Sequence, residues 1–129
     1  MESGLWKIKT FKDLRVWQAA HALSLEIYSI TRNFPKFEQY GLSSQMQRAS
    51  VSVCSNIAEG FGRKSLKEKD QFYSMANGSL TELENQLLIA QGIGYIKKEP
   101  LDAVYSQCES VHKMLNKLQT VNKQKGVQG

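Results

Sequence analysis

The stretch from Leu42 to Gly60 constrains the fold more than any other part of the chain. Apolar side chains recur there at spacings of three and four residues, at Leu42, Met46, Ala49, Val53 and Ile57. This period is that of an amphipathic helix. A second set of side chains is polar and falls about 100° further round the same helix; it comprises Gln45, Arg48, Ser52, Asn56 and Glu59. Such an ordered polar stripe indicates a second contact, with a neighbouring helix or another subunit; the alternative is an ordinary solvated face.

Three further segments show the helical period and complete a set of four helices. The expected helices cover residues of about 11–33, 42–60, 66–92 and 100–122. Capping boxes begin the first and the third, at Thr10 with Asp13 and at Ser65 with Glu68. The short connections favour antiparallel neighbours. The sequence therefore predicts an all-α chain, a single domain over residues 1–129, folded as an up-down-up-down antiparallel four-helix bundle.

Two glycines and the C-terminal tail carry local predictions. Gly60 is expected to take a left-handed cap at the end of the second helix, and the polar tail from Lys123 to Gly129 is expected to fray. Gly78 lies inside the third helix, where glycine costs about 1 kcal/mol relative to alanine. With Ala76 and Ser79 it predicts a patch of small residues that another backbone approaches closely; the alternative is a tolerated glycine without a role.

The register of the second and third helices predicts an ion pair. If the two helices run antiparallel about the turn at 61–64, residues whose numbers sum to roughly 125 face each other. Arg48 then lies about one turn from Glu82. We expect these two side chains to pair, within one chain or across an interface between chains.

No residue set typical of catalysis or metal binding occurs in the chain. His21 and His112 lack a second ligand at helical spacing, and the carboxylates form no convergent pair. Cys54 and Cys108 fit no metal or redox motif and are expected to be reduced thiols; the alternative is a disulfide between them. No apolar run reaches the ~18 residues of a membrane span, and no signal peptide is evident. The sequence therefore predicts a cytoplasmic protein without enzymatic activity, cofactor or membrane partner.

The charge of the chain is concentrated at one end of the predicted bundle. The formal net charge is +5. In an antiparallel bundle the N-terminus, the turn after the second helix and the C-terminus meet. These segments bring together 11 cations and 5 anions, whereas the rest of the chain has 6 cations and 7 anions. This basic pole is the electrostatic pattern of a phosphate-backbone binder; the alternative is a solubility feature. The expected contacts are Lys12, Arg15, Arg63, Lys64, Lys67 and Lys69.

Several short motifs give the chain a family resemblance. They are Phe34-Pro35, Tyr40-Gly41-Leu42, Asn56-Ile-Ala-Glu-Gly60 and Gly78-Ser-Leu-x-Glu-Leu83, with Gln45, Arg48, Ser52 and Ser79 among the shared positions. Over roughly residues 10–122 the chain resembles the bacterial 23S rRNA intervening-sequence, or S23 ribosomal, proteins. The resemblance implies a four-helix bundle that assembles as a homopentamer. A distant relative, the accessory variability determinant protein of diversity-generating retroelements, binds nucleic acid and a reverse transcriptase.

Two functional hypotheses follow from these observations. The first is a non-enzymatic, ring-like homo-oligomer that binds RNA or DNA through the basic pole. The second is a protein–protein scaffold, whose partner could be a nucleic-acid enzyme such as a reverse transcriptase. Neither an aromatic ladder nor a recognition motif supports the reading of a particular nucleotide sequence.

Overall fold

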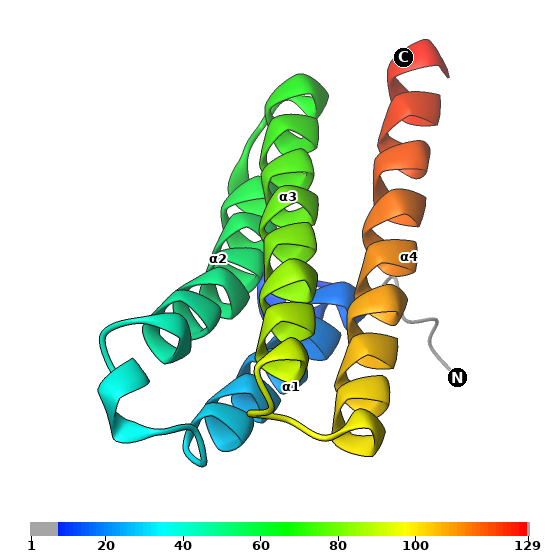
Figure 1. Cartoon of the computed structure of the whole chain (residues 1–129). Coiled ribbons are helices and arrows are strands. Elements are labelled where there is room, and N and C mark those ends of the chain that lie inside the picture. The colour runs from blue at the N-terminus through cyan, green and yellow to red at the C-terminus, as the bar shows by residue number, and fades with distance from the viewer. Residues whose placement is uncertain (1–7, 129) are drawn as a thin grey trace.

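The computed structural model describes residues 8–128, which contain helices and no strand (Figure 1). The all-α prediction is confirmed. The elements are the short 3₁₀ helices η2 (Phe11–Asp13) and η3 (Lys36–Glu38), and the α-helices α1 (Arg15–Thr31), α2 (Leu42–Gly62), α3 (Leu66–Gly92) and α4 (Lys98–Gln128). Four helices of this length agree with the four predicted from periodicity. None of the described helices is both long and apolar enough to cross a membrane.

The capping box at Thr10 is present, but it caps a 3₁₀ turn rather than a long helix. The Thr10 side chain accepts from the Lys12 amide, and the Asp13 carboxylate accepts from the Thr10 amide at 3.0 Å. Leu14 then has an extended backbone, with φ −74° and ψ 129°, which separates η2 from α1. The expected single helix over 11–33 is therefore two elements. At α3 the Ser65 side chain accepts from the Glu68 amide, as predicted.

The prediction of a left-handed cap at Gly60 is wrong. Gly60 is a buried helical residue, and α2 continues to Gly62. A Cβ at Gly60 would lie 2.6 Å from a ring carbon of Tyr73, so the absence of a side chain allows α2 to approach α3 closely. Among the described residues the one positive φ belongs to Gly94, in the connection between α3 and α4.

The prediction that the tail from Lys123 to Gly129 frays is also wrong for its described residues, because α4 continues to Gln128; Gly129 lies outside the described residues. Lysine and glutamine are good helix formers, so a polar composition does not by itself end a helix. The hollow beside this end is lined from both helices: by Leu66 of α3 and by Gly126 of α4, among others.

The hydrophobic core lies between the four helices. α2 packs on α1 and α3, while α4 packs on α3 and α1, so each helix has two neighbours. Fully buried side chains come from every helix and include Leu23, Ile27, Met46, Val53, Ile57, Leu80, Leu83, Leu87 and Leu115. Ser24 of α1 and Ser50 of α2 are buried, and their hydroxyls lie 3.1 Å apart. This pairing satisfies polar groups that would otherwise be costly to bury.

The ends of the elements meet in two groups. The turn between α2 and α3 lies at the same end of the molecule as the C-terminal end of α4 (Figure 1). At the opposite end the Tyr95 hydroxyl, after α3, donates to the Glu38 carboxylate of η3 at 2.8 Å. Residues of the α2–α3 turn and of the α4 terminus can therefore act on one ligand.

Candidate nucleic-acid interface

The beginning of α3 and the end of α4 form the centre of the basic pole. Leu66, Lys67 and Asp70 of α3 line a hollow of about 210 Å³ together with Asn122, Lys123 and Gly126 of α4. Lys67 and Lys123 are exposed at its rim. Lys125 lies close enough to Lys69 for its charge to lower the pKa of Lys69. The beginning of α3 and the end of α4, two of the three segments predicted to meet, therefore lie next to each other.

Lys69 is engaged in the fold and is not a free cation. Its ammonium donates to the carbonyl oxygen of Phe61 at 2.6 Å and to that of Gly60 at 3.3 Å. These carbonyls belong to the last turn of α2, where a cation is favoured, and that of Gly60 also accepts from the Arg63 amide at 3.2 Å. Burial, and then the charge of Lys125, lower the pKa of Lys69. Its main role is to cap α2.

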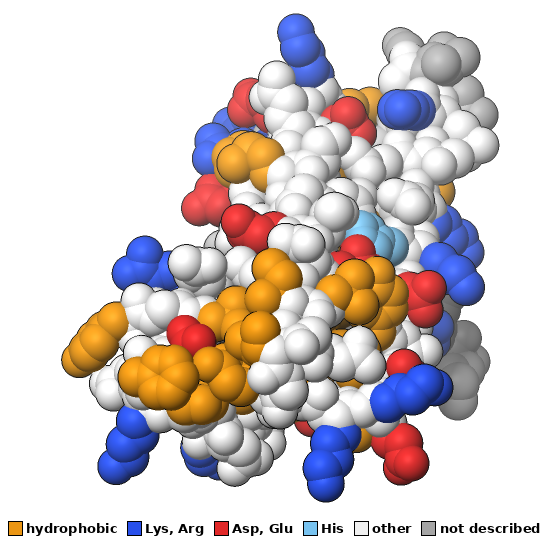
Figure 2. Space-filling view, in the orientation of Figure 1, with side chains coloured by type: hydrophobic (Ala, Val, Ile, Leu, Met, Phe, Trp, Pro, Cys, Tyr) orange, Lys and Arg blue, Asp and Glu red, His pale blue; other side chains and the backbone are white. Residues whose placement is uncertain are grey.

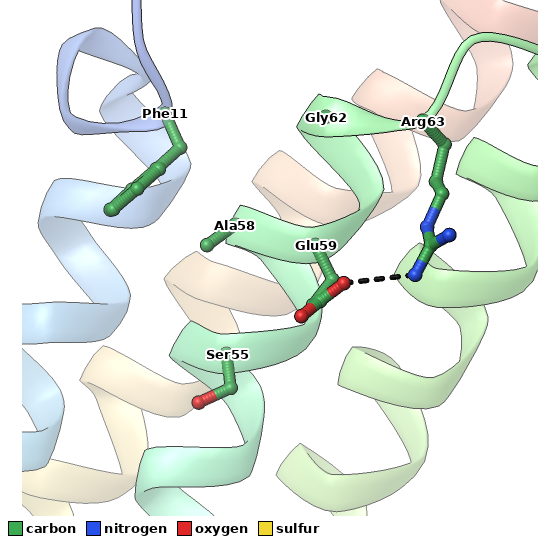
Figure 3. Close-up of a pocket in the computed structure, with 6 residues that line it drawn as sticks. All are labelled: Phe11, Ser55, Ala58, Glu59, Gly62 and Arg63. Atoms are coloured by element: carbon green, nitrogen blue, oxygen red, sulfur yellow. Dashed lines mark hydrogen bonds and ion pairs between the residues drawn. The ribbon is translucent and has the colours of Figure 1, made fainter.

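Arg63 is also held within the chain. Its guanidinium lies 3.0 Å from the Glu59 carboxylate and 4.6 Å from the centre of the Phe72 ring. Figure 3 shows this ion pair on one side of an open hollow of about 540 Å³, with Phe11 of η2 on the other side. Ser55, Ala58 and Gly62 complete the lining. Arg63 is partly neutralised, so it contributes less free charge than the sequence suggests.

The remaining predicted contacts are exposed. Lys64 lies in the turn, Lys67 in the first turn of α3, Lys12 in η2 and Arg15 at the start of α1. The hollow in Figure 3 places η2 beside the end of α2, so Lys12 belongs to the same part of the surface. Glu2 and Lys7 belong to the charges predicted to gather at the basic pole, and Trp6 is an aromatic residue expected beside them; all three lie outside the described residues.

The polar stripe of α2 divides into two parts. The Ser52 hydroxyl lies 2.8 Å from the Ser79 hydroxyl of α3, and the Asn56 amide donates to the carbonyl and hydroxyl of Ser52. This part faces a neighbouring helix, which is one of the two contacts considered from the sequence. Gln45, Arg48 and Glu59 are exposed instead.

The intrachain form of the Arg48–Glu82 ion pair is wrong. No such contact within 4.0 Å occurs among the described residues, and both side chains are exposed. The register differs from the expectation as well. The Ser52–Ser79 contact places residues whose numbers sum to 131 at one level, and the continuation of α2 two residues past Gly60 accounts for part of this shift. Arg48 and Glu82 are therefore nearly level but point outwards, and pairing across an interface stays a prediction.

The predicted patch of small residues on α3 is also wrong as one surface. Ala76 is fully buried and Ser79 faces Ser52, whereas Gly78 is exposed with nothing within 4 Å of a Cβ built on it. Among the described residues, no backbone outside this part of α3 lies within 4 Å of that Cβ. The described part of the chain thus gives no packing reason for the glycine.

A polar network between α3 and α4 escaped the sequence analysis. The two ring nitrogens of His112 lie 2.7 Å from the Asn77 amide oxygen and 2.9 Å from the Glu84 carboxylate. The Asn77 amide nitrogen donates to Gln119, whose own amide donates to Asp70. In the sequence, the only sign of this network is that these polar positions flank the apolar stripes of the third and fourth helices. The described residues hold no group of three His, Cys, Asp or Glu side chains suited to a metal ion.

A comparison with family models identifies the chain. The model described as 23S rRNA-intervening sequence protein matches residues 12–117. The chain belongs to this family. The matched span contains Lys12, Arg15 and the α2–α3 turn, while Lys123 and Lys125 lie beyond it. In this member of the 23S rRNA-intervening sequence protein family, α4 therefore carries two exposed lysines, Lys123 and Lys125, past the matched region.

A solved structure of the S23 ribosomal protein family, from Bacteroides thetaiotaomicron VPI-5482, has the same fold. It superposes with a TM-score of 0.73 at 20% sequence identity, covering 81% of this chain and 97% of that one. That protein is described as having unknown function. No curated protein matches the chain. For this 23S rRNA-intervening sequence protein family member, the likeness supports the fold, and function has to be argued from the surface.

Proposed function

We propose that this protein is a non-enzymatic homo-oligomer, an up-down-up-down antiparallel bundle assembled as a ring of five, that binds RNA through its basic pole. The observation that carries the binding proposal is the gathering of exposed lysines from different segments at one end of the molecule. Lys64 and Lys67 belong to the α2–α3 region, and Lys123 to the end of α4. Cations brought together in this way attract a phosphate backbone by releasing its counterions.

The fold also limits how strong this grip can be. Arg63 is paired with Glu59, and Lys69 caps α2, so two of the six predicted contacts are partly used within the chain. Glu68 and Asp70 oppose the remaining charge. We therefore expect moderate binding that does not depend on nucleotide sequence. The assignment to RNA rather than DNA is supported by the family description, which refers to 23S rRNA. A ring of subunits with aligned poles would strengthen binding through multivalency.

Paired substitutions at the two ends of the molecule test the proposal. The pole variant carries Lys64→Ala with Lys67→Ala, and the control carries Lys36→Ala with Lys97→Ala; all four lysines are exposed, and both variants lose two positive charges. Fluorescence anisotropy with a labelled single-stranded RNA, repeated over a salt series, gives affinity and salt slope. The pole variant should bind more weakly, with a slope smaller by up to about 1.4 per subunit.

The control should retain the affinity and salt slope of the unsubstituted protein. Equal losses in the two variants would reject the basic pole as the binding site. A salt slope near zero for the unsubstituted protein would reject nucleic-acid binding itself and favour a protein–protein scaffold, with a nucleic-acid enzyme as the partner to seek. A DNA oligonucleotide of the same sequence tests the preference for RNA.

A further inference from the structure

The outward face of α3 does not have the character of a solvated helix face. Exposed residues follow one another at spacings of four and three: Gln71, Met75, Gly78, Glu82, Asn85 and Ile89. This is the heptad rhythm by which one helix packs against another. Met75 is 53% exposed and Ile89 47%. Figure 2 looks onto α3 and shows hydrophobic side chains along it, gathered most densely towards η3.

α2 carries a second outward stripe with the same rhythm and smaller side chains. Its members are Ser44, Arg48, Val51, Ser55, Ala58 and Gly62, all exposed or half-exposed. They lie opposite the buried face of α2, away from the residues that contact α3. Ser55, Ala58 and Gly62 also line the open hollow whose other side is formed by Phe11 of η2. The two stripes thus offer one chain two different surfaces, which is what a heterologous contact between copies requires.

The two stripes are complementary when the α2 of one copy is laid antiparallel to the α3 of another at the same level. Pairing numbers that sum to about 130, close to the 131 of the Ser52–Ser79 contact within a chain, sets Arg48 against Glu82. Val51 then faces Gly78, so that a large side chain meets the residue without one. Ser44, which precedes Arg48 in the α2 stripe, faces Asn85. Copies related by rotation about an axis along the helices lie at a common level.

The contact continues past the end of the helices on the same register. Phe37 of one copy then comes opposite Ile93 of the next. Tyr40 of the first copy lies close to Ile89 of the next, because position 41 is the one opposite Ile89. Phe37 is 79% exposed, Tyr40 90% and Ile93 53%. An aromatic side chain can bury ~150–250 Å². Phe37 and Tyr40 extend the α2 side of the contact and Ile93 extends the α3 side, so each partner adds apolar area towards the ~800 Å² that it buries in a stable interface.

Gly78 supplies an independent argument for a partner. Glycine inside a helix lowers its stability relative to alanine, and here no neighbour among residues 8–128 would meet a Cβ. Arg48 and Glu82 likewise have no ion-pair partner among the described residues. A nucleic acid is a poor partner for this face of α3, because Glu82 would repel its phosphates. The aliphatic Ile89 and Ile93, which lie near it, do not stack on bases as aromatic rings do.

We infer that the outward stripe of α3 binds the outward stripe of α2 in a second copy of this chain, with Arg48 of one copy paired to Glu82 of the next. This inference rests on the proposed homo-oligomer and assigns its interface. Each copy offers both stripes, so the contact repeats head to tail and closes into a ring when the rotation allows it. The basic poles of all copies then lie on the same side.

A size measurement on matched variants tests the assignment. Gly78→Gln should leave a helical, folded subunit, because the side chain has open space in the monomer, but should raise the dissociation constant of the oligomer at least tenfold. Ala103→Gln, an exposed position of α4 outside both stripes, is the control and should not change it. Circular dichroism checks the fold, and sedimentation velocity at micromolar concentration gives the mass.

Two further variants probe the register. Arg48→Glu should dissociate the oligomer, and adding Glu82→Arg should restore it. Ser55→Cys combined with Met75→Cys should, on oxidation, give a ladder of covalent multimers that neither single substitution gives. An oligomeric unsubstituted protein that keeps its mass with Gly78→Gln and forms no ladder would overturn this interface and leave the proposed oligomer standing. A mass near 14.6 kDa for the unsubstituted protein would overturn both.

Discussion

Gly60→Ala should destabilise the protein although it replaces a glycine inside a helix. Gly60 is buried where α2 meets α3. A Cβ there would lie 2.6 Å from one ring carbon of Tyr73, 3.0 Å from another and 3.0 Å from the Cβ of Phe72. Ordinary contacts of a Cβ begin at 3.4 Å, so the ring must move by about 0.8 Å or the helices must separate. Tyr73 is 2% exposed, which leaves its ring little room.

Two opposing contributions set the size of the effect. Alanine gains about 1 kcal/mol in helix propensity over glycine. Overpacking of a well-filled core costs about 1–3 kcal/mol, and the upper part of this range applies because the obstructing group is a buried ring. The net loss should therefore be about 2 kcal/mol in the free energy of unfolding, which corresponds to a fall in Tm of roughly 6–10 °C for a domain of this size.

Urea unfolding followed by circular dichroism at one fixed protein concentration measures this loss, because the stability of an oligomer depends on concentration. The control is Gly92→Ala at the end of α3, where nothing lies within 4 Å of an added Cβ. It should change stability by less than about 1 kcal/mol, towards greater stability. If Gly60→Ala proves as stable as Gly92→Ala, the close approach of α2 and α3 does not depend on this glycine.

Three further predictions concern single side chains. Hydrogen bonds from the amides of residues 9 and 10 hold the pKa of Asp13 below its usual value. The contribution of the Asp13 carboxylate to folding stability is therefore present above the unfolded pKa of ~3.9 and is lost as pH falls through the lower folded pKa. The difference in urea midpoint between the unsubstituted protein and Asp13→Asn should vanish in acid. Lys69→Met should lower the free energy of unfolding by about 1–2 kcal/mol because it uncaps α2, whereas Lys67→Met should change it by no more than about 0.5 kcal/mol. A lower Tm for Lys67→Met than for Lys69→Met in thermal melts would contradict the capping role. Burial raises the pKa of Cys54 to about 11 and that of Cys108 to about 12, so mass spectrometry should find both thiols far slower to react with iodoacetamide at pH 8 than in urea.

Periodicity predicted the helices well because a buried stripe leaves a local pattern in the sequence. The third helix begins and ends where it was expected, at Leu66 and Gly92. Gly60 was misassigned because one residue type serves two purposes. A glycine near the end of an apolar stripe fits a helix cap, and only the position of Tyr73 reveals that it is needed for close packing. Such tertiary contacts are absent from a local pattern.

The candidate site was less predictable, because charge counted from sequence ignores what each cation already contacts. The basic pole was anticipated from topology, and the hollow between α3 and α4 supports it. The engagement of Arg63 with Glu59 follows a helical spacing of four and could have been foreseen. The capping of α2 by Lys69 depends on the geometry of a turn and could not. His112 joins side chains 28 and 35 positions away, for which spacing offers no rule.

The short link between α2 and α3, formed by residues 63–65, has a consequence for how the chain folds. Closing so small a loop loses little conformational entropy, whereas contacts of α1 with α4 join distant parts of the chain. Routes rich in local contacts are fast. We expect the α2–α3 hairpin to form in the transition state, so that Val53→Ala and Leu80→Ala slow folding while Leu115→Ala mainly speeds unfolding. Both stripes assigned to the interface lie on this hairpin, so the surface for assembly arises in the earliest part of the chain to fold.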